Sequence, residues 1–131
     1  MLEVLRIDHV TFVVSELEPA RRFYAELLGM TPVPRPAFPF DGLWFQAGTT
    51  QIHLILEHPA SGPADHPAPP ITAERSRTRH IAFEVPDARR TTEKLRELGI
   101  PIIAGPKLRP DGFLQLYIRD PDGNVVELFS Q

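Results

Sequence analysis

The sequence contains one short pattern twice, and this repeat constrains the fold more than any other feature. Residues 9–14 read His-Val-Thr-Phe-Val-Val, and residues 80–85 read His-Ile-Ala-Phe-Glu-Val. The histidine, the phenylalanine and the final valine are identical, and the two copies are 71 residues apart. An amphipathic stretch that ends in glycine follows each copy, at Gly29 and at Gly99. The chain is therefore interpreted as a duplicated half-domain that carries a histidine at the same point of each half.

Each half has the pattern of a strand, a helix and further strands. In the first half we expect a strand at 7–14, an apolar helical stripe at 20–28 that follows Pro19, and a hairpin within 43–57. In the second half, a strand at 79–85 precedes a helix that is capped by Asp87 and ends at Gly99. Three more strands are expected at residues 101–104, 113–118 and 125–129. The fold class predicted is α+β, with two paired βαβββ modules that form a cupped mixed β-sheet with helices outside.

The size and composition are those of one compact domain of 131 residues, 42% of them apolar. We expect module one at about 1–58, a proline-rich link at about 59–77 and module two at about 78–131. The net charge of -3 gives no electrostatic reason to expect nucleic acid or membrane binding. The N-terminus lacks the regions of a signal peptide, and no apolar run approaches 18 residues, so we expect a cytoplasmic protein.

Four side chains that can bind a metal lie in equivalent predicted strands of the two halves. His9 corresponds to His80, and His53 corresponds more loosely to Glu127, which follows it by 74 residues. Cysteine is absent, so any metal site must use His, Asp or Glu. A single strand histidine is usually packed and hydrogen-bonded. Burying several such groups without partners costs several kcal/mol each by rough estimate, so the repeated placement favours a metal site.

The remaining polar and aromatic residues have simpler interpretations. His58 and His66 lie beside prolines in the link and are interpreted as solvated loop residues. Arg109 could meet an anionic or carbonyl substrate, but an exposed loop arginine is the commoner outcome. Tyr24 and Trp44 are interpreted as core or interface residues rather than catalytic ones.

Several segments together resemble the vicinal oxygen chelate superfamily over nearly the whole chain. Its members include glyoxalase I, methylmalonyl-CoA epimerase, extradiol dioxygenases, fosfomycin-modifying enzymes and bleomycin-sequestering proteins. The most specific part is Asp-Pro-Asp-Gly-Asn at 120–124, followed three residues later by Glu127. The other matching segments are Ile7–Val10, Arg22–Tyr24, Leu27–Gly29 and Arg79–Phe83.

The resemblance implies paired βαβββ modules, a metal site and commonly a homodimer. Carried over position by position, the first-strand ligand falls on His9, the fifth-strand ligand on His80 and the last-strand carboxylate on Glu127. The fourth-strand position falls on His53, where bacterial glyoxalase I enzymes usually have Glu and the epimerases have Gln. This departure leaves the reaction open. Bleomycin-binding members lack the ligands, so the presence of all four argues against that branch.

Three imidazoles and a carboxylate suit a divalent ion such as Ni, Co, Zn, Fe or Mn. The resemblance then implies a glyoxalase-like lyase or isomerase that acts on a small vicinal-oxygen substrate through an enolate or enediolate, with Glu127 as ligand and catalytic base. An Fe(II) extradiol-type dioxygenase, in which His9, His80 and Glu127 form a facial triad, is also compatible with these residues. So are a fosfomycin-type transferase and a drug- or metabolite-binding resistance protein. Specificity is expected in the loops at 31–42 and 59–78.

Overall fold

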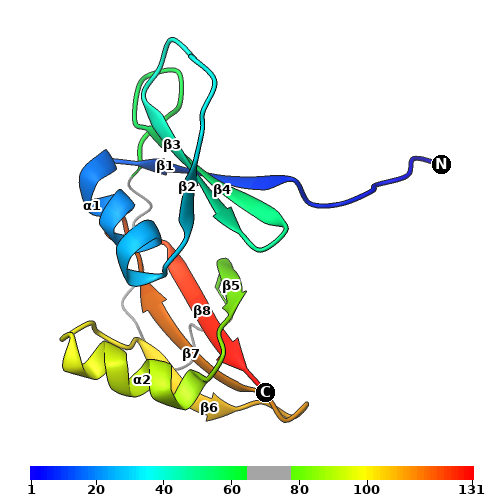
Figure 1. Ribbon diagram of the computed structural model, residues 1–131, viewed down its shortest axis with the longest axis vertical. Helices are drawn as coiled ribbons and strands as arrows, with labels where there is room; N and C mark the ends of the chain where they lie inside the picture. The colour runs from blue at the N-terminus through cyan, green and yellow to red at the C-terminus, as the bar shows by residue number, and fades with distance from the viewer. Residues whose placement is uncertain (65–77) are drawn as a thin grey trace. The chain divides into compact units, whose positions relative to one another are not determined.

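The computed structural model describes residues 1–64 and 78–131, and the chain divides into two compact units, 1–66 and 67–131. Both units contain a strand, a helix and three further strands in that order (Figure 1). Each unit has one four-stranded mixed sheet, which confirms the α+β class and the two βαβββ modules. Much of the predicted link, including His66, lies outside the described residues. In the described ranges, none of the helices is long and apolar enough to cross a membrane.

The first unit has the sheet order β1-β4-β3-β2, with β1 parallel to β4 and the other neighbours antiparallel. A short α-helix runs directly into a π-helical turn between the first two strands. The elements are β1 (His9–Val14), α1 (Leu17–Arg21), η1 (Arg22–Leu27), β2 (Thr31–Val33), β3 (Gly42–Ala47) and β4 (Thr50–Leu56).

One aromatic residue anchors the helical segment of the first unit on its sheet. The fully buried Tyr24 lies between Phe12 of β1 and Phe45 of β3, with ring centroids 6.2 and 6.4 Å away. Strand side chains alternate between the two faces of a sheet, so this contact assigns one face of β1, β3 and β4 to the core. His9 and His53 belong to the opposite face, away from the helical segment. The prediction that Tyr24 is a core residue is confirmed.

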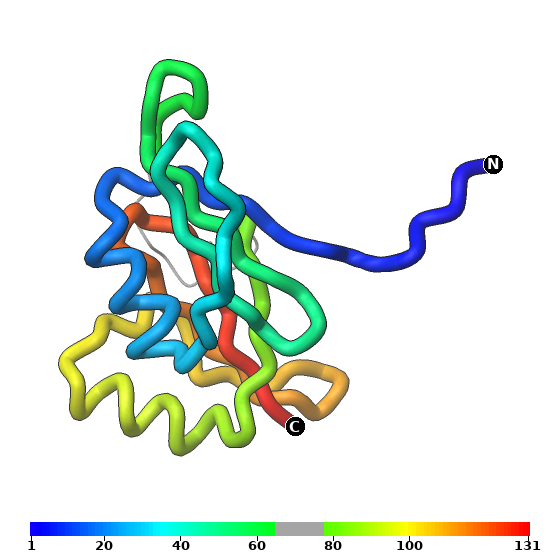
Figure 2. Tube along the Cα trace, turned by 45° about the horizontal axis from the view of Figure 1, so that its top comes forward, coloured from blue at the N-terminus to red at the C-terminus, as the bar shows by residue number. Residues whose placement is uncertain are grey.

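The second unit repeats this topology with the sheet order β5-β8-β7-β6, and β5 is parallel to β8. Figure 2 follows the chain through the first unit from blue to green and through the second from yellow-green to red. The elements are β5 (His80–Glu84), α2 (Ala88–Glu97), β6 (Ala104–Leu108), β7 (Leu114–Arg119) and β8 (Val125–Ser130).

Helix α2 begins and packs as the sequence predicts. The Asp87 side chain accepts hydrogen bonds from the backbone N–H groups of Arg89 and Arg90, which confirms it as the N-cap. The buried residues Ala88 and Leu95 are seven positions apart and share one side of the helix, which contacts β7 and β8. The helix therefore covers one face of the sheet and leaves the other face to the polar residues of β5 and β8.

One edge strand of each sheet, β2 in the first and β6 in the second, differs from the sequence expectation. The strand predicted at 101–104 is wrong: β6 begins at Ala104 and runs to Leu108, with an irregular register around Gly105-Pro106. In the first unit, β2 occupies Thr31–Val33, the start of a segment expected to be a loop. Each of these strands contains a proline, which sheets tolerate at an edge and which weakens the strand pattern in a sequence.

The turn between β7 and β8 is held by one buried carboxylate. Asp120, only 4% exposed, accepts hydrogen bonds from the backbone N–H groups of Asp122 and Asn124 and from the Asn124 side-chain amide, at 2.8–2.9 Å. This turn sets where β8 begins, and β8 carries Glu127. The strong turn predicted at 120–124 therefore also positions a candidate site residue.

Replacing this carboxylate tests its role in the fold. We expect Asp120→Ala to lower the free energy of unfolding by about 1–3 kcal/mol, because it leaves turn donors without an acceptor. Urea unfolding should be followed by circular dichroism, since the single tryptophan lies in the first unit and would not report on this turn. Glu97→Ala, at an exposed end of α2, serves as the control and should change stability by less than about 0.5 kcal/mol. Equal stability of Asp120→Ala and wild type would contradict this role.

Candidate metal-binding site

The strand register places His53 and Glu127 at equivalent positions of the two sheets. In the first sheet Thr11 of β1 pairs with His53 of β4, and in the second Ala82 of β5 pairs with Glu127 of β8. Thr11 and Ala82 each follow the repeated histidine by two residues. The correspondence of His53 with Glu127, the looser of the two in the sequence, is therefore confirmed by the register.

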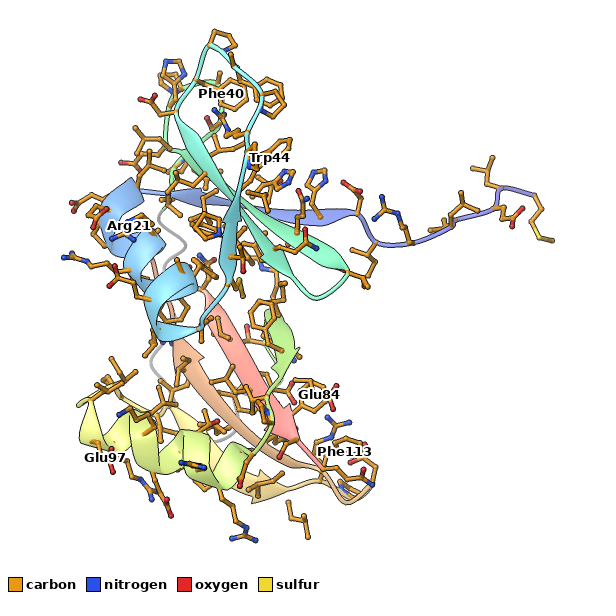
Figure 3. The ribbon with its side chains drawn as sticks, viewed as in Figure 1. Arg21, Phe40, Trp44, Glu84, Glu97 and Phe113 are labelled. Atoms are coloured by element: carbon orange, nitrogen blue, oxygen red, sulfur yellow. The ribbon has the colours of Figure 1, made fainter. Side chains whose placement is uncertain are left out.

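The first unit brings His9 and His53 into direct contact. Their rings stack with centroids 4.0 Å apart and planes inclined by 12°. Trp44 of β3, labelled in Figure 3, stacks on His53 as well, at 3.9 Å and 4°. His53 is 6% exposed, whereas His9, the first residue of β1, is exposed to solvent. Trp44, interpreted from the sequence as a core or interface residue, is half-buried and is a direct neighbour of a candidate ligand.

Hydrogen bonds orient both imidazoles of this pair. His53 Nε2 lies 2.9 Å from the Gln51 side-chain oxygen, and His9 Nδ1 lies 2.8 Å from the Asp8 carboxylate. These oxygens accept, so the protons belong on His53 Nε2 and His9 Nδ1. The lone pairs are then on His53 Nδ1 and His9 Nε2. Histidines that bind metals usually donate their second ring N–H to such an acceptor.

Burial keeps the His53 ring neutral. Desolvation is the main cause that lowers the pKa of His53 below its usual value, and the neighbouring His9 lowers it further. Only the neutral imidazole has a lone pair for a metal ion. The environment of His53 therefore favours the form that can be a ligand.

The second unit brings His80 and Glu127 together. His80 Nε2 lies 3.0 Å from Glu127 Oε2, and His80 Nδ1 lies 2.7 Å from the backbone oxygen of Thr78. Both ring nitrogens of His80 therefore face oxygen atoms. If a divalent cation bound in this unit, His80 and Glu127 would be the residues that hold it.

Two further residues surround the Glu127 carboxylate. The Tyr117 hydroxyl hydrogen-bonds to Glu127, and burial, the Glu127 charge and this bond all raise the pKa of Tyr117. The hydroxyl therefore stays protonated and donates. Arg109 Nη1 lies 3.6 Å from Glu127 Oε1, while Nη2 binds Asp111 at 2.6 Å. Arg109, for which an exposed loop position was the commoner expectation, is half-buried in the loop after β6, and its guanidinium also lies over the Phe113 ring.

The structure thus gathers the four predicted ligands as two pairs, one in each unit. No cluster of three or more histidine or carboxylate side chains that could hold an ion is found within 1–64 and 78–131. The joint four-residue site stays a prediction. The donors in each pair, imidazole nitrogen and carboxylate oxygen, are those that borderline divalent ions prefer. His58 lies in the exposed loop after β4, as expected.

Comparison with known proteins decides the family. The sequence signature of the Glyoxalase/Bleomycin resistance protein/Dioxygenase superfamily matches residues 6–128. The chain belongs to this superfamily. Its match covers both units, including the two candidate pairs, and agrees with the resemblance seen in the sequence.

The similarity to individual relatives extends over nearly the whole length of this chain. Virulence protein STM3117 of Salmonella typhimurium is 30% identical over 130 residues, 94% of this chain and 82% of that protein. A crystal structure described as a glyoxalase family protein of Bacillus anthracis is 30% identical with a TM-score of 0.76, covering 98% and 97% of the two chains. Lactoylglutathione lyase of Agrobacterium tumefaciens is 25% identical with a TM-score of 0.69, covering 95% and 92%.

The lowered pKa of His53 predicts how stability depends on pH in the metal-free protein. Above the unfolded-state pKa of 6.5 the ring is neutral in the folded and the unfolded chain. As the pH falls from 6.5 through the lower folded-state pKa, the unfolded chain takes up the proton first, so the free energy of unfolding decreases. We expect His53→Gln to show a smaller decrease than wild type in urea unfolding followed by Trp44 fluorescence with a chelator present.

His58→Gln is the matched control, because His58 lies in an exposed loop of the same unit. Its pH dependence should follow that of wild type. The same pH dependence in wild type and in His53→Gln would show that burial of His53 does not lower its affinity for protons.

Proposed function

We propose that this protein is a divalent-metal-dependent, glyoxalase-like lyase or isomerase that acts on a small substrate with two neighbouring oxygens. The proposed ligands are His9, His53, His80 and Glu127, with Glu127 also acting as the base. The metal is one of Ni, Co, Zn, Fe or Mn, which this donor set accepts.

One observation carries the proposal: the two sheets hold their candidate pairs at the same register. A histidine stands at the start of β1 and of β5, and a second donor stands opposite the residue two positions later, on β4 and β8. Independent packing reasons would have to place two such side chains in the same pattern in each of the two sheets. A shared ligand function explains the repeat with one cause.

The orientation of the imidazoles supports the same function. Asp8, Gln51 and the Thr78 carbonyl each hold one ring nitrogen of a candidate histidine. This arrangement fixes the tautomer and the ring plane, which raises metal affinity in known sites. When bound, a divalent cation supplies a Lewis acid that stabilises negative charge on a substrate enolate.

The protein's own groups would move the proton. The Glu127 carboxylate is buried, and the Tyr117 hydroxyl and the Arg109 guanidinium both lie beside it. An anionic carboxylate in a site with little water is a suitable base for a C–H proton next to a carbonyl. Arg109, held by Asp111, is also the residue we propose to meet an oxygen of the substrate.

Turnover of a hemithioacetal after metal exchange tests the reaction. The substrate is chosen because the similar Agrobacterium tumefaciens protein is a lactoylglutathione lyase. Chelator-treated protein should be inactive and should regain activity with Ni or Co. Glu127→Gln should lower kcat by at least about 100-fold, since a general base contributes roughly that much. His58→Ala, in the exposed loop, should keep wild-type activity.

Three different results would each favour a rival function. Oxygen uptake on catechols by the iron-loaded protein, with no hemithioacetal turnover, would replace the proposal with the extradiol dioxygenase function. Transfer of a thiol to fosfomycin would indicate the transferase. Tight binding of a drug by protein that takes up no metal would indicate sequestration.

We also propose that the protein acts on a small-molecule substrate as a homodimer in the cytoplasm. Dimers are common in the superfamily to which the chain belongs. Sedimentation equilibrium should give about twice the chain mass of 14.8 kDa, and a single-chain mass would contradict the dimer.

A further inference from the structure

The two units place an aromatic residue at the same sheet position, next to a candidate ligand. Trp44 of β3 pairs with His53 of β4, and Tyr117 of β7 pairs with Glu127 of β8. The duplication therefore extends beyond the ligands. In each sheet a row of side chains crosses the strands from the aromatic residue through the second candidate donor.

In the first unit, stacking restricts the His53 ring. The ring lies between Trp44 at 3.9 Å and His9 at 4.0 Å, with all three planes nearly parallel. Rotation of the imidazole about the Cβ–Cγ bond would push the edge of the ring into Trp44 and His9. Gln51 on Nε2 adds a further contact in the ring plane. His53 is thus held in one orientation before any ligand arrives.

In the second unit, Tyr117 contacts both members of the pair. Its ring meets His80 edge-on, with centroids 5.5 Å apart and planes at 85°. Its hydroxyl hydrogen-bonds to the Glu127 carboxylate, with which it shares a register position. Tyr117 is 5% exposed, so water competes little for this hydrogen bond. Tyr117 contacts its candidate ligand by a hydrogen bond and Trp44 by stacking, but the two residues occupy the same position in their sheets.

We propose that Trp44 and Tyr117 are positioning residues for the metal site: Trp44 holds the imidazole of His53 by stacking, and Tyr117 holds the carboxylate of Glu127 by hydrogen bonding. This inference rests on the proposed function, because it assumes that both side chains bind a cation. Residues that hold ligands in this way typically change metal affinity about 10- to 100-fold when they are replaced.

A fold-stabilising role predicts a different pattern of effects. Phe45 neighbours Trp44 on β3 but faces the helical segment, where it is 1% exposed and packs on Tyr24. Replacing Phe45 should lower stability without moving His53. Trp44 is only half-buried, so its replacement should affect the ligand more than the fold. The pair Trp44→Leu and Phe45→Leu therefore separates the two roles on one strand.

Cobalt titration by calorimetry of chelator-treated protein provides the first test. We expect Trp44→Leu and Tyr117→Phe each to weaken Co²⁺ binding roughly 10-fold. Trp44→Phe keeps a ring on His53 and should restore most of the affinity. Phe45→Leu should bind Co²⁺ as wild type does in its folded fraction. Wild-type affinity in both Trp44→Leu and Tyr117→Phe would overturn the proposal and leave the metal site standing.

Proton NMR of the metal-free protein provides the second test, which needs no cation. The ring protons of His53, assigned with His53→Gln, should be shifted upfield by the Trp44 ring. Trp44→Leu should remove that shift, and Phe45→Leu should leave it. An unchanged His53 spectrum in Trp44→Leu would overturn the stacking role. A wild-type protein that binds no Co²⁺ but shows the NMR change would refute the proposed function, while the restraint on His53 would hold.

Discussion

The structure depends on the register of two parallel strand pairs, β1 with β4 and β5 with β8. A shift of one residue in either pair would turn every side chain to the other face of the sheet. His53 or Glu127 would then point into a helix-covered core, where an unpaired polar group costs several kcal/mol by rough estimate. The apolar contacts of Tyr24 and of α2 specify which face is buried. The core thus fixes the register, and the register fixes both pairs.

The two pairs offer complementary chemistry on one scaffold. The first unit supplies two stacked imidazoles, one of which burial keeps neutral. The second supplies an imidazole and a carboxylate that lie 3.0 Å apart. Imidazole nitrogen and carboxylate oxygen are the donors that borderline divalent ions prefer.

Much of this could be predicted from the sequence, because the repeat and the strand alternation are local patterns. The modules, the Asp87 cap and the 120–124 turn follow from such patterns. The edge strands β2 and β6 could not be predicted in this way, because their prolines weaken the sequence pattern of a strand and their pairing with neighbouring strands stabilises them. Trp44 and Tyr117 do not stand out as site residues in the sequence, because the cross-strand pairing that places them beside the donors is not a local property. A comparison of β3 with β7 in the repeat could have found them.

Measuring how many cations bind, and which half binds them, tests the central claim most directly. Chelator-treated wild type, His53→Ala and Glu127→Gln should each be dialysed against limiting Ni²⁺ and the bound metal counted by mass spectrometry. If the two pairs form one site, wild type holds one ion per chain and either substitution removes it. If Glu127→Gln keeps a full ion on the first unit, or His53→Ala keeps one on the second, the two pairs do not share a cation and the four-ligand site is wrong.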